Sequence, residues 1–89
     1  MNLGADVAII AGNDKDTLKA SFRSTEIFYA KTGLHLGDDM TKPLAKLYRG
    51  EGGGHPTAAG VNGVGDSEEF LVRAAEYVAR ALGKPSQVL

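Results

Sequence analysis

The chain has 89 residues, a formal net charge of −1 and no cysteine, and hydrophobic residues make up 43% of it. A chain of this size buries only about 60–65% of the surface that it exposes when unfolded, so it supports one small core. The lack of cysteine excludes disulfide scaffolds and thiolate metal sites, and the near-neutral charge excludes a polycation that coats nucleic acid. We find neither a secretion signal nor an apolar run of about 18 residues, and we therefore expect no membrane association.

The first part of the chain predicts an antiparallel β-hairpin. Residues 5–11 form an apolar run rich in β-branched side chains, which is typical of a buried strand. Apolar and polar residues alternate over residues 17–24, which indicates a half-buried strand. Turn residues over 12–16 join the two segments. The alternation assigns Leu18, Ala20 and Phe22 to the core, and Lys19, Ser21 and Arg23 to the other face.

The middle of the chain has a weaker pattern. Residues 26–31 fit either a strand extension or a helical turn, and we predict a loop over 32–38. A short helix is expected over 40–49, because Thr41 can act as its N-cap and Gly50 stands where a C′ glycine belongs.

Glycine is the compositional outlier, with 12 of the 89 residues, about twice the usual share of roughly 7%. Residues 50–61 hold a dense group of them, which we predict to be a loop that leads into a short third strand, or the start of a tight turn, over residues 58–61. Asn62-Gly63 and Gly65 predict turns after it. The last element is a helix that begins with the capping pair Asp66 and Glu69 and ends at Gly83. Its apolar residues recur at helical spacing and predict one buried stripe, which consists of Phe70, Leu71, Ala74, Tyr77, Val78, Ala81 and Leu82. The expected fold is a small α/β (α+β) sheet with an N-terminal hairpin, helices packed on one face, and a glycine-rich loop between a helix and the third strand.

Three consecutive glycines before His55 need a backbone reason, because each glycine costs conformational entropy on folding. Successive N–H groups of residues 52–54 could form a concavity for an anion, with His55 as a further donor. The alternative is a flexible surface loop with an idle histidine. The run has neither the lysine of a phosphate-binding P-loop nor the preceding strand of a dinucleotide fingerprint.

Two other groups of polar residues are weaker candidates. Arg23, at the end of a strand on its polar face, can bind a phosphate or carboxylate with two parallel hydrogen bonds, although an exposed arginine is most often only solvated. His35, Asp38 and Asp39 could ligate a hard cation, but two of them are adjacent in the sequence and the chain has only one other histidine.

The segment Ser21-Phe22-Arg23-Ser24, a short helix, and the run Gly-Gly-Gly-His-Pro-Thr-Ala-Ala-Gly over residues 52–60 together resemble the DHH-associated domain. This is the C-terminal domain of DHH-family phosphoesterases, which include RecJ-type single-strand exonucleases and enzymes that degrade short RNA or dinucleotides. The resemblance covers about residues 5–83. It implies that Arg23 and Ser24 contact phosphate, and that the pocket for the terminal nucleotide and its phosphate is lined by Gly52, Gly53, Gly54 and His55.

The resemblance also implies what accompanies the domain. Residues 1–89 would be one substrate-binding domain, excised from a two-domain phosphoesterase, with no catalytic residue and no cofactor of its own. The partner in the same polypeptide would be an N-terminal catalytic domain, whose Asp-His-His motif holds two divalent metals, expected to be manganese. The substrate would be single-stranded nucleic acid, short RNA or a nucleotide phosphoester, and the location would be cytoplasmic.

Two departures keep other interpretations open. No Asp-His-His motif occurs in the chain, and residues 28–40 look longer than the usual link between the arginine strand and the helix. A related domain forms the C-terminal part of alanyl-tRNA synthetases and helps to bind tRNA. One alternative is therefore a free-standing or fused module that binds nucleic acid or mediates oligomerisation. The other is a structural domain whose glycine loop has no binding role.

Overall fold

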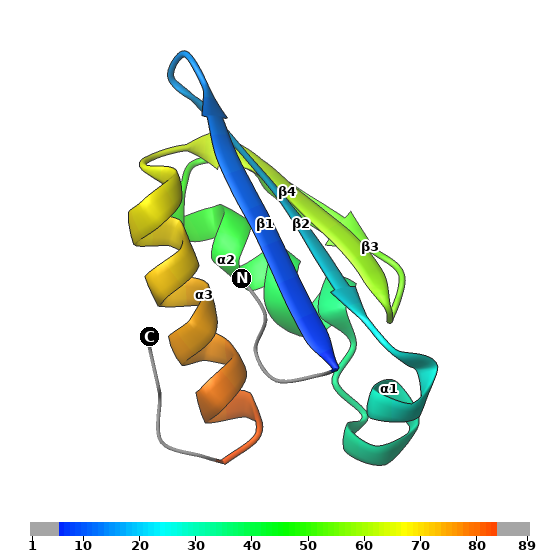
Figure 1. Cartoon of the computed structure of the whole chain (residues 1–89). Helices are drawn as coiled ribbons and strands as arrows, with labels where there is room; N and C mark the ends of the chain where they lie inside the picture. The colour runs from blue at the N-terminus through cyan, green and yellow to red at the C-terminus, as the bar shows by residue number, and fades with distance from the viewer. Residues whose placement is uncertain (1–5, 84–89) are drawn as a thin grey trace.

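The structure is a computed structural model that describes residues 6–83, and these residues form a four-stranded antiparallel sheet backed by helices (Figure 1). The sheet order is β1-β2-β4-β3. The elements in chain order are β1 (Val7–Asp14), β2 (Thr17–Ser24), α1 (Glu26–Thr32), the π-helix η1 (Leu36–Thr41), α2 (Lys42–Leu47), β3 (Glu51–Gly54), β4 (Ala58–Val64) and α3 (Ser67–Ala81). The predicted α+β class and the N-terminal hairpin are confirmed.

The helices leave one side of the sheet uncovered. Helix α3 packs against β1 and β2, while η1 and α2 pack against β3 and β4. Figure 1 shows α2 and α3 on the same side of the sheet. We call the other side the open face. Since paired residues of antiparallel strands point to the same side, the register places on it Ala8, Ile10, Gly12, Asp14, Thr17, Lys19, Ser21, Arg23, Glu51, Gly53, Ala58, Gly60, Asn62 and Val64.

The core lies between the sheet and the helices. Leu18, Ala20 and Phe22 are buried as predicted. The ring of Phe22 meets Phe70 of α3 edge to face, with 6.1 Å between centroids. Phe70 also contacts Tyr48 at 5.1 Å. These aromatic contacts join β2, the end of α2 and α3 in one core.

The hairpin is longer than predicted, because β1 extends to Asp14 and the turn consists of residues 15 and 16 alone. The expected turn residue Asn13 belongs to the strand for a tertiary reason. Its side-chain amide donates to the carbonyl of Gly65 at 2.7 Å and accepts from the N–H of Ser67 at 2.9 Å. Asn13 thereby ties β1 to the start of α3. Ala5, the first residue of the expected strand, lies outside the described residues.

The sequence left open whether residues 26–31 extend the strand or form a helical turn, and the structure shows that they belong to helix α1. The Thr25 side chain accepts from the N–H of Phe28 at 3.0 Å and caps α1. Gly33, with φ of 70°, ends this helix.

The loop predicted over 32–38 is wrong in its second half, because η1 begins at Leu36. Thr41 stands at the N-cap position of α2 as predicted, but its backbone is helical and its side chain makes no capping hydrogen bond. It is fully buried and donates its hydroxyl to the carbonyl of Gly37 at 2.9 Å, so η1 and α2 form one continuous helical segment. Arg49, with φ of 54°, takes the left-handed conformation expected of Gly50. Gly50 is needed instead for close contact, since a Cβ there would overlap the carbonyl oxygen of Asn62.

The third strand and the last helix follow the sequence more closely. Strand β4 begins at Ala58 as expected but continues to Val64, so the turn predicted at Asn62 and Gly63 is strand. The Asp66 side chain accepts from the N–H of Glu69 at 2.9 Å, which confirms the N-cap of α3. Gly83, with φ of 70°, follows the helix as predicted. No helix within residues 6–83 has the length and hydrophobicity that a membrane crossing requires.

Candidate anion site on the open face

The glycine run is not a loop, as the sequence suggested, but the edge strand β3. Gly52, Gly53 and Gly54 pair with Val61, Gly60 and Ala59 of β4. The N–H groups of successive strand residues point in opposite directions. The three N–H groups therefore do not converge on one point, and the expected anion concavity of consecutive N–H groups is wrong.

The surroundings of the three glycines differ, so the run has no single structural explanation. A Cβ on Gly52 would overlap the carbonyl of Thr41, and Gly54 has φ of 142° with Ala59 Cα only 2.6 Å from the place of a Cβ. These two glycines serve packing and backbone conformation. Gly53 is different, because the nearest atom to its Cβ position is the Cε of Lys42 at 3.9 Å. Neither crowding nor a left-handed backbone requires glycine there. Because Gly53 has no side chain, the open face is hollowed at this position.

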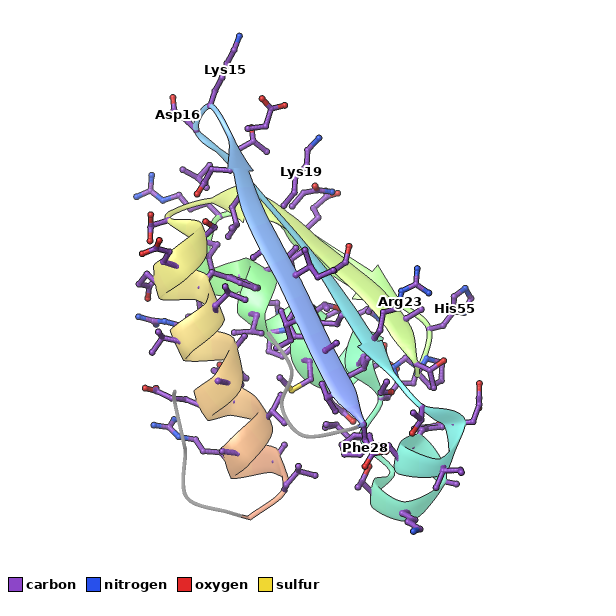
Figure 2. All side chains as sticks on the ribbon, viewed as in Figure 1. Lys15, Asp16, Lys19, Arg23, Phe28 and His55 are labelled. Carbon is purple, nitrogen blue, oxygen red and sulfur yellow. The ribbon has the colours of Figure 1, made fainter. Side chains whose placement is uncertain are left out.

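Arg23 and His55 lie at the same end of the open face. Arg23 pairs with Ala58 in the sheet, and the N–H of His55 donates to the carbonyl of the same Ala58 at 2.8 Å. This bond extends the β3–β4 ladder by one pair, so two strand spacings of about 4.8 Å separate the two residues. Both are exposed, and Figure 2 shows their side chains close together at this end of the sheet. A guanidinium and an imidazole so placed can both donate to one anion.

A shallow hollow of about 370 Å³ lies beside these side chains. Small residues form most of its wall, which consists of Ser21, Arg23, Gly53, Gly54, Ala58, Ala59 and Gly60. Among residues 6–83, Arg23 forms no ion pair. Its charge is therefore available to a ligand in the hollow.

Ser24 is separated from this group. The alternation of β2 places Ser24 on the helix side of the sheet, opposite to Arg23. Its N–H donates to the carbonyl of Thr57 at 3.0 Å, and its hydroxyl oxygen is buried without a hydrogen-bond partner within residues 6–83. The two neighbours in sequence, predicted as a pair, do not share a face.

The acidic residues considered as metal ligands instead build the start of η1. The His35 Nδ1 accepts from the N–H of Asp38 at 2.9 Å, and an Asp39 carboxylate oxygen accepts from the N–H of His35 at 2.9 Å. Lys42 donates to Asp38 at 2.8 Å, and this hydrogen bond lowers the pKa of the Asp38 carboxyl. In the described part of the chain, no group of three or more histidine and acidic residues is arranged to hold a metal ion.

Sequence reasoning missed two residues beside the candidate site. Lys42 reaches the edge of β3 next to Gly53. In the structure it lies four residues after Asp38 and pairs with that carboxylate, but nothing in the sequence indicates its nearness to the glycines. Ser21 was assigned to the polar face of its strand without a role, and it lines the hollow with Arg23.

A family model described as the DHHA1 domain matches residues 1–81. The chain belongs to the DHHA1 family. DHHA1 domains are the DHH-associated C-terminal domains of DHH-family phosphoesterases, so the resemblance inferred from the arginine strand and the glycine–histidine run is confirmed. A comparison with curated proteins found no significant match. In this DHHA1 domain the glycine–histidine run forms the edge strand of the sheet and the residue that follows it.

Proposed function

We propose that this DHHA1 domain binds the phosphate and terminal nucleotide of a single-stranded nucleic acid or short oligonucleotide for a DHH-family phosphoesterase. The observation that carries the proposal is the placement of Arg23 and His55 on one end of an uncovered sheet face, beside a hollow lined by glycines. The domain itself performs no hydrolysis in this proposal. A catalytic domain in the same polypeptide supplies the two divalent metals, which we expect to be manganese.

The chemistry of the residues supports phosphate as the ligand. The Arg23 guanidinium presents donors in a planar fork that matches two phosphate oxygens, and His55 adds a donor from the other side of Ala58. Gly53 and Gly60, paired across β3 and β4, keep the floor of the hollow free of side chains. A ribose or base can then rest against the sheet while the phosphate contacts the rim.

The proposal is tested by titrating the ¹⁵N-labelled chain with adenosine 5′-monophosphate. Arg23→Ala and His55→Ala should each weaken binding about tenfold or more, because a hydrogen bond to a charged group is worth roughly 1.5–3 kcal/mol. Both side chains are exposed, so both variants should keep their fold. Arg80→Ala, which removes an exposed arginine from α3 on the other layer, is the matched control. Equal affinity in all four proteins would show that the phosphate site lies elsewhere.

The competing interpretation is a nucleic-acid-binding module that is not part of a hydrolase. It uses the same binding surface, but the domain is then not joined to a DHH catalytic domain. The native reading frame decides between the two. An upstream segment with an Asp-His-His motif supports the phosphoesterase. A reading frame without such a segment, in a protein that still binds nucleotide through Arg23, would favour the module.

A further inference from the structure

The open face extends well beyond the Arg23–His55 end. A second and larger hollow of about 600 Å³ adjoins the first and shares Ser21, Gly53 and Gly60 with it. It continues along β2 and β4 toward Lys19 and Asn62, and Ile10 of β1 forms part of its wall. The two hollows thus form one trough along the uncovered side of the sheet.

Polar side chains line this trough at a regular interval. Arg23, Ser21 and Lys19 are alternate residues of β2, all exposed and all on the open face. Figure 2 shows Lys19 and Arg23 projecting from the same side of the strand. Within residues 6–83, neither of these two cations forms an ion pair. The other charges on the open face are Asp14 at the hairpin end and Glu51 on β3, which also lines the larger hollow. The positive charges of the open face are therefore on β2, and the one carboxylate that the described residues place in the trough lies at its β3 edge.

The interval matches the repeat of a single-stranded nucleic acid. Alternate residues of a strand are joined by six backbone bonds and lie about 6.6 Å apart. Six bonds also join successive phosphorus atoms in a phosphodiester chain, and six extended bonds in a peptide span about 7 Å. An extended strand of nucleotides that lies parallel to β2 can therefore present consecutive phosphates to consecutive open-face residues.

We propose that the open face binds a single strand of at least three nucleotides along β2, with successive phosphates at Arg23, Ser21 and Lys19. This inference rests on the proposed function, because the terminal phosphate sits at the Arg23–His55 end. The sugars and bases lie over Gly60 and Gly53, where no side chain obstructs them. Ile10, whose side chain is 73% exposed, offers an apolar contact to a base. Along β2 the trough reaches no further toward the hairpin than Lys19. Beyond it, Asp14 and Asp16 flank Lys15 at the hairpin tip and disfavour a further phosphate.

The test compares uridine 5′-monophosphate with 5′-phosphorylated triuridylate, with thymidylate probes in parallel, on the ¹⁵N-labelled chain. The trinucleotide should bind about tenfold more tightly, and it alone should shift the amides of Lys19, Gly60 and Asn62. In Lys19→Ala the ratio of the two affinities should fall to about two. The salt dependence of trinucleotide binding should also fall by about 0.7 in logarithmic slope, the contribution of one phosphate contact.

The control is Lys46→Ala, which removes an exposed lysine from the last turn of α2 on the helix layer. This variant should keep the wild-type ratio. Equal affinity for both probes in the wild type, or an unchanged ratio in Lys19→Ala, would overturn the trough while leaving the Arg23–His55 site in place. Failure of every probe to shift Arg23 and His55 would instead overturn the proposed function and this inference together.

Discussion

The glycine run shows at the residue scale that neighbouring glycines can serve different ends. Gly52 and Gly54 are fixed by the backbone atoms around them, whereas Gly53 faces the open side of the sheet with free space above it. The three glycines are identical in the sequence. Only the tertiary contacts distinguish the two glycines that packing requires from Gly53, which shapes the open face. Within the run, only Gly54 has a positive φ.

The difference predicts opposite effects of the same substitution. Gly52→Ala and Gly54→Ala should each lower the free energy of unfolding by about 1–3 kcal/mol, the usual cost of overpacking. Gly53→Ala should leave stability unchanged or raise it by about 0.5 kcal/mol, because alanine loses less backbone entropy in a strand. Urea denaturation of the three variants measures this. A loss at Gly53 as large as at its neighbours would contradict the free space that the structure shows there.

The elements are held together by contacts that local patterns do not show. The hydroxyl of Tyr48, at the end of α2, donates to the Glu69 carboxylate of α3 at 2.6 Å. Glu69 also accepts from Arg73 at 3.0 Å, and the Arg73 guanidinium lies 5.9 Å from the centre of the Tyr48 ring. Burial of the phenol, together with the hydrogen bond to Glu69, raises the pKa of Tyr48 above its ordinary range. Glu69 was predicted only as a capping residue, and its side chain instead connects two helices.

This link predicts a pH-dependent difference between the wild type and Tyr48→Phe. At neutral pH the variant should be less stable by about 2 kcal/mol, since a partly buried hydrogen bond to a charged group is lost. The folded-state pKa of Tyr48 is raised, so its contribution is complete below the unfolded value of about 10 and declines as the pH rises above that value. Urea denaturation at pH 7 and pH 10.5 should therefore show the gap between the two proteins narrowing. A gap that widens would contradict the raised pKa.

The sequence predicted the elements whose signals are local and failed where distant contacts decide. The alternation of β2 and the cap and apolar stripe of α3 are local, and both are confirmed. The π-helix η1 could not be foreseen, because Gly37 looks like a helix breaker. In the fold it allows η1 to approach β3, where a Cβ would lie 2.5 Å from the carbonyl oxygen of Gly54. Exposed Ala81 is the one member of the predicted stripe of α3 that does not face the core.

At the scale of the whole molecule, the helices cover one side of the sheet and leave the other side uncovered. The sequence suggested Arg23 and His55 as site residues, but it placed the histidine at the end of a loop and paired Arg23 with Ser24. The sheet register replaces that pair with a row in which Ala58 stands between Arg23 and His55. Pairing between distant strands determines this row, and a single sequence does not contain it. The family match places the chain among DHHA1 domains, and the fold provides the uncovered sheet face on which our proposed site lies.

One measurement tests this account most directly. It is a map of the amide shifts that adenosine 5′-monophosphate causes in the ¹⁵N-labelled wild-type chain. The account predicts shifts that cluster at Ser21, Arg23, Gly53, His55 and Gly60, with the outer face of α3 unaffected. Shifts that cluster on α3 or on the tip of the hairpin, with the open face silent, would contradict the claim that the uncovered side of the sheet binds phosphate.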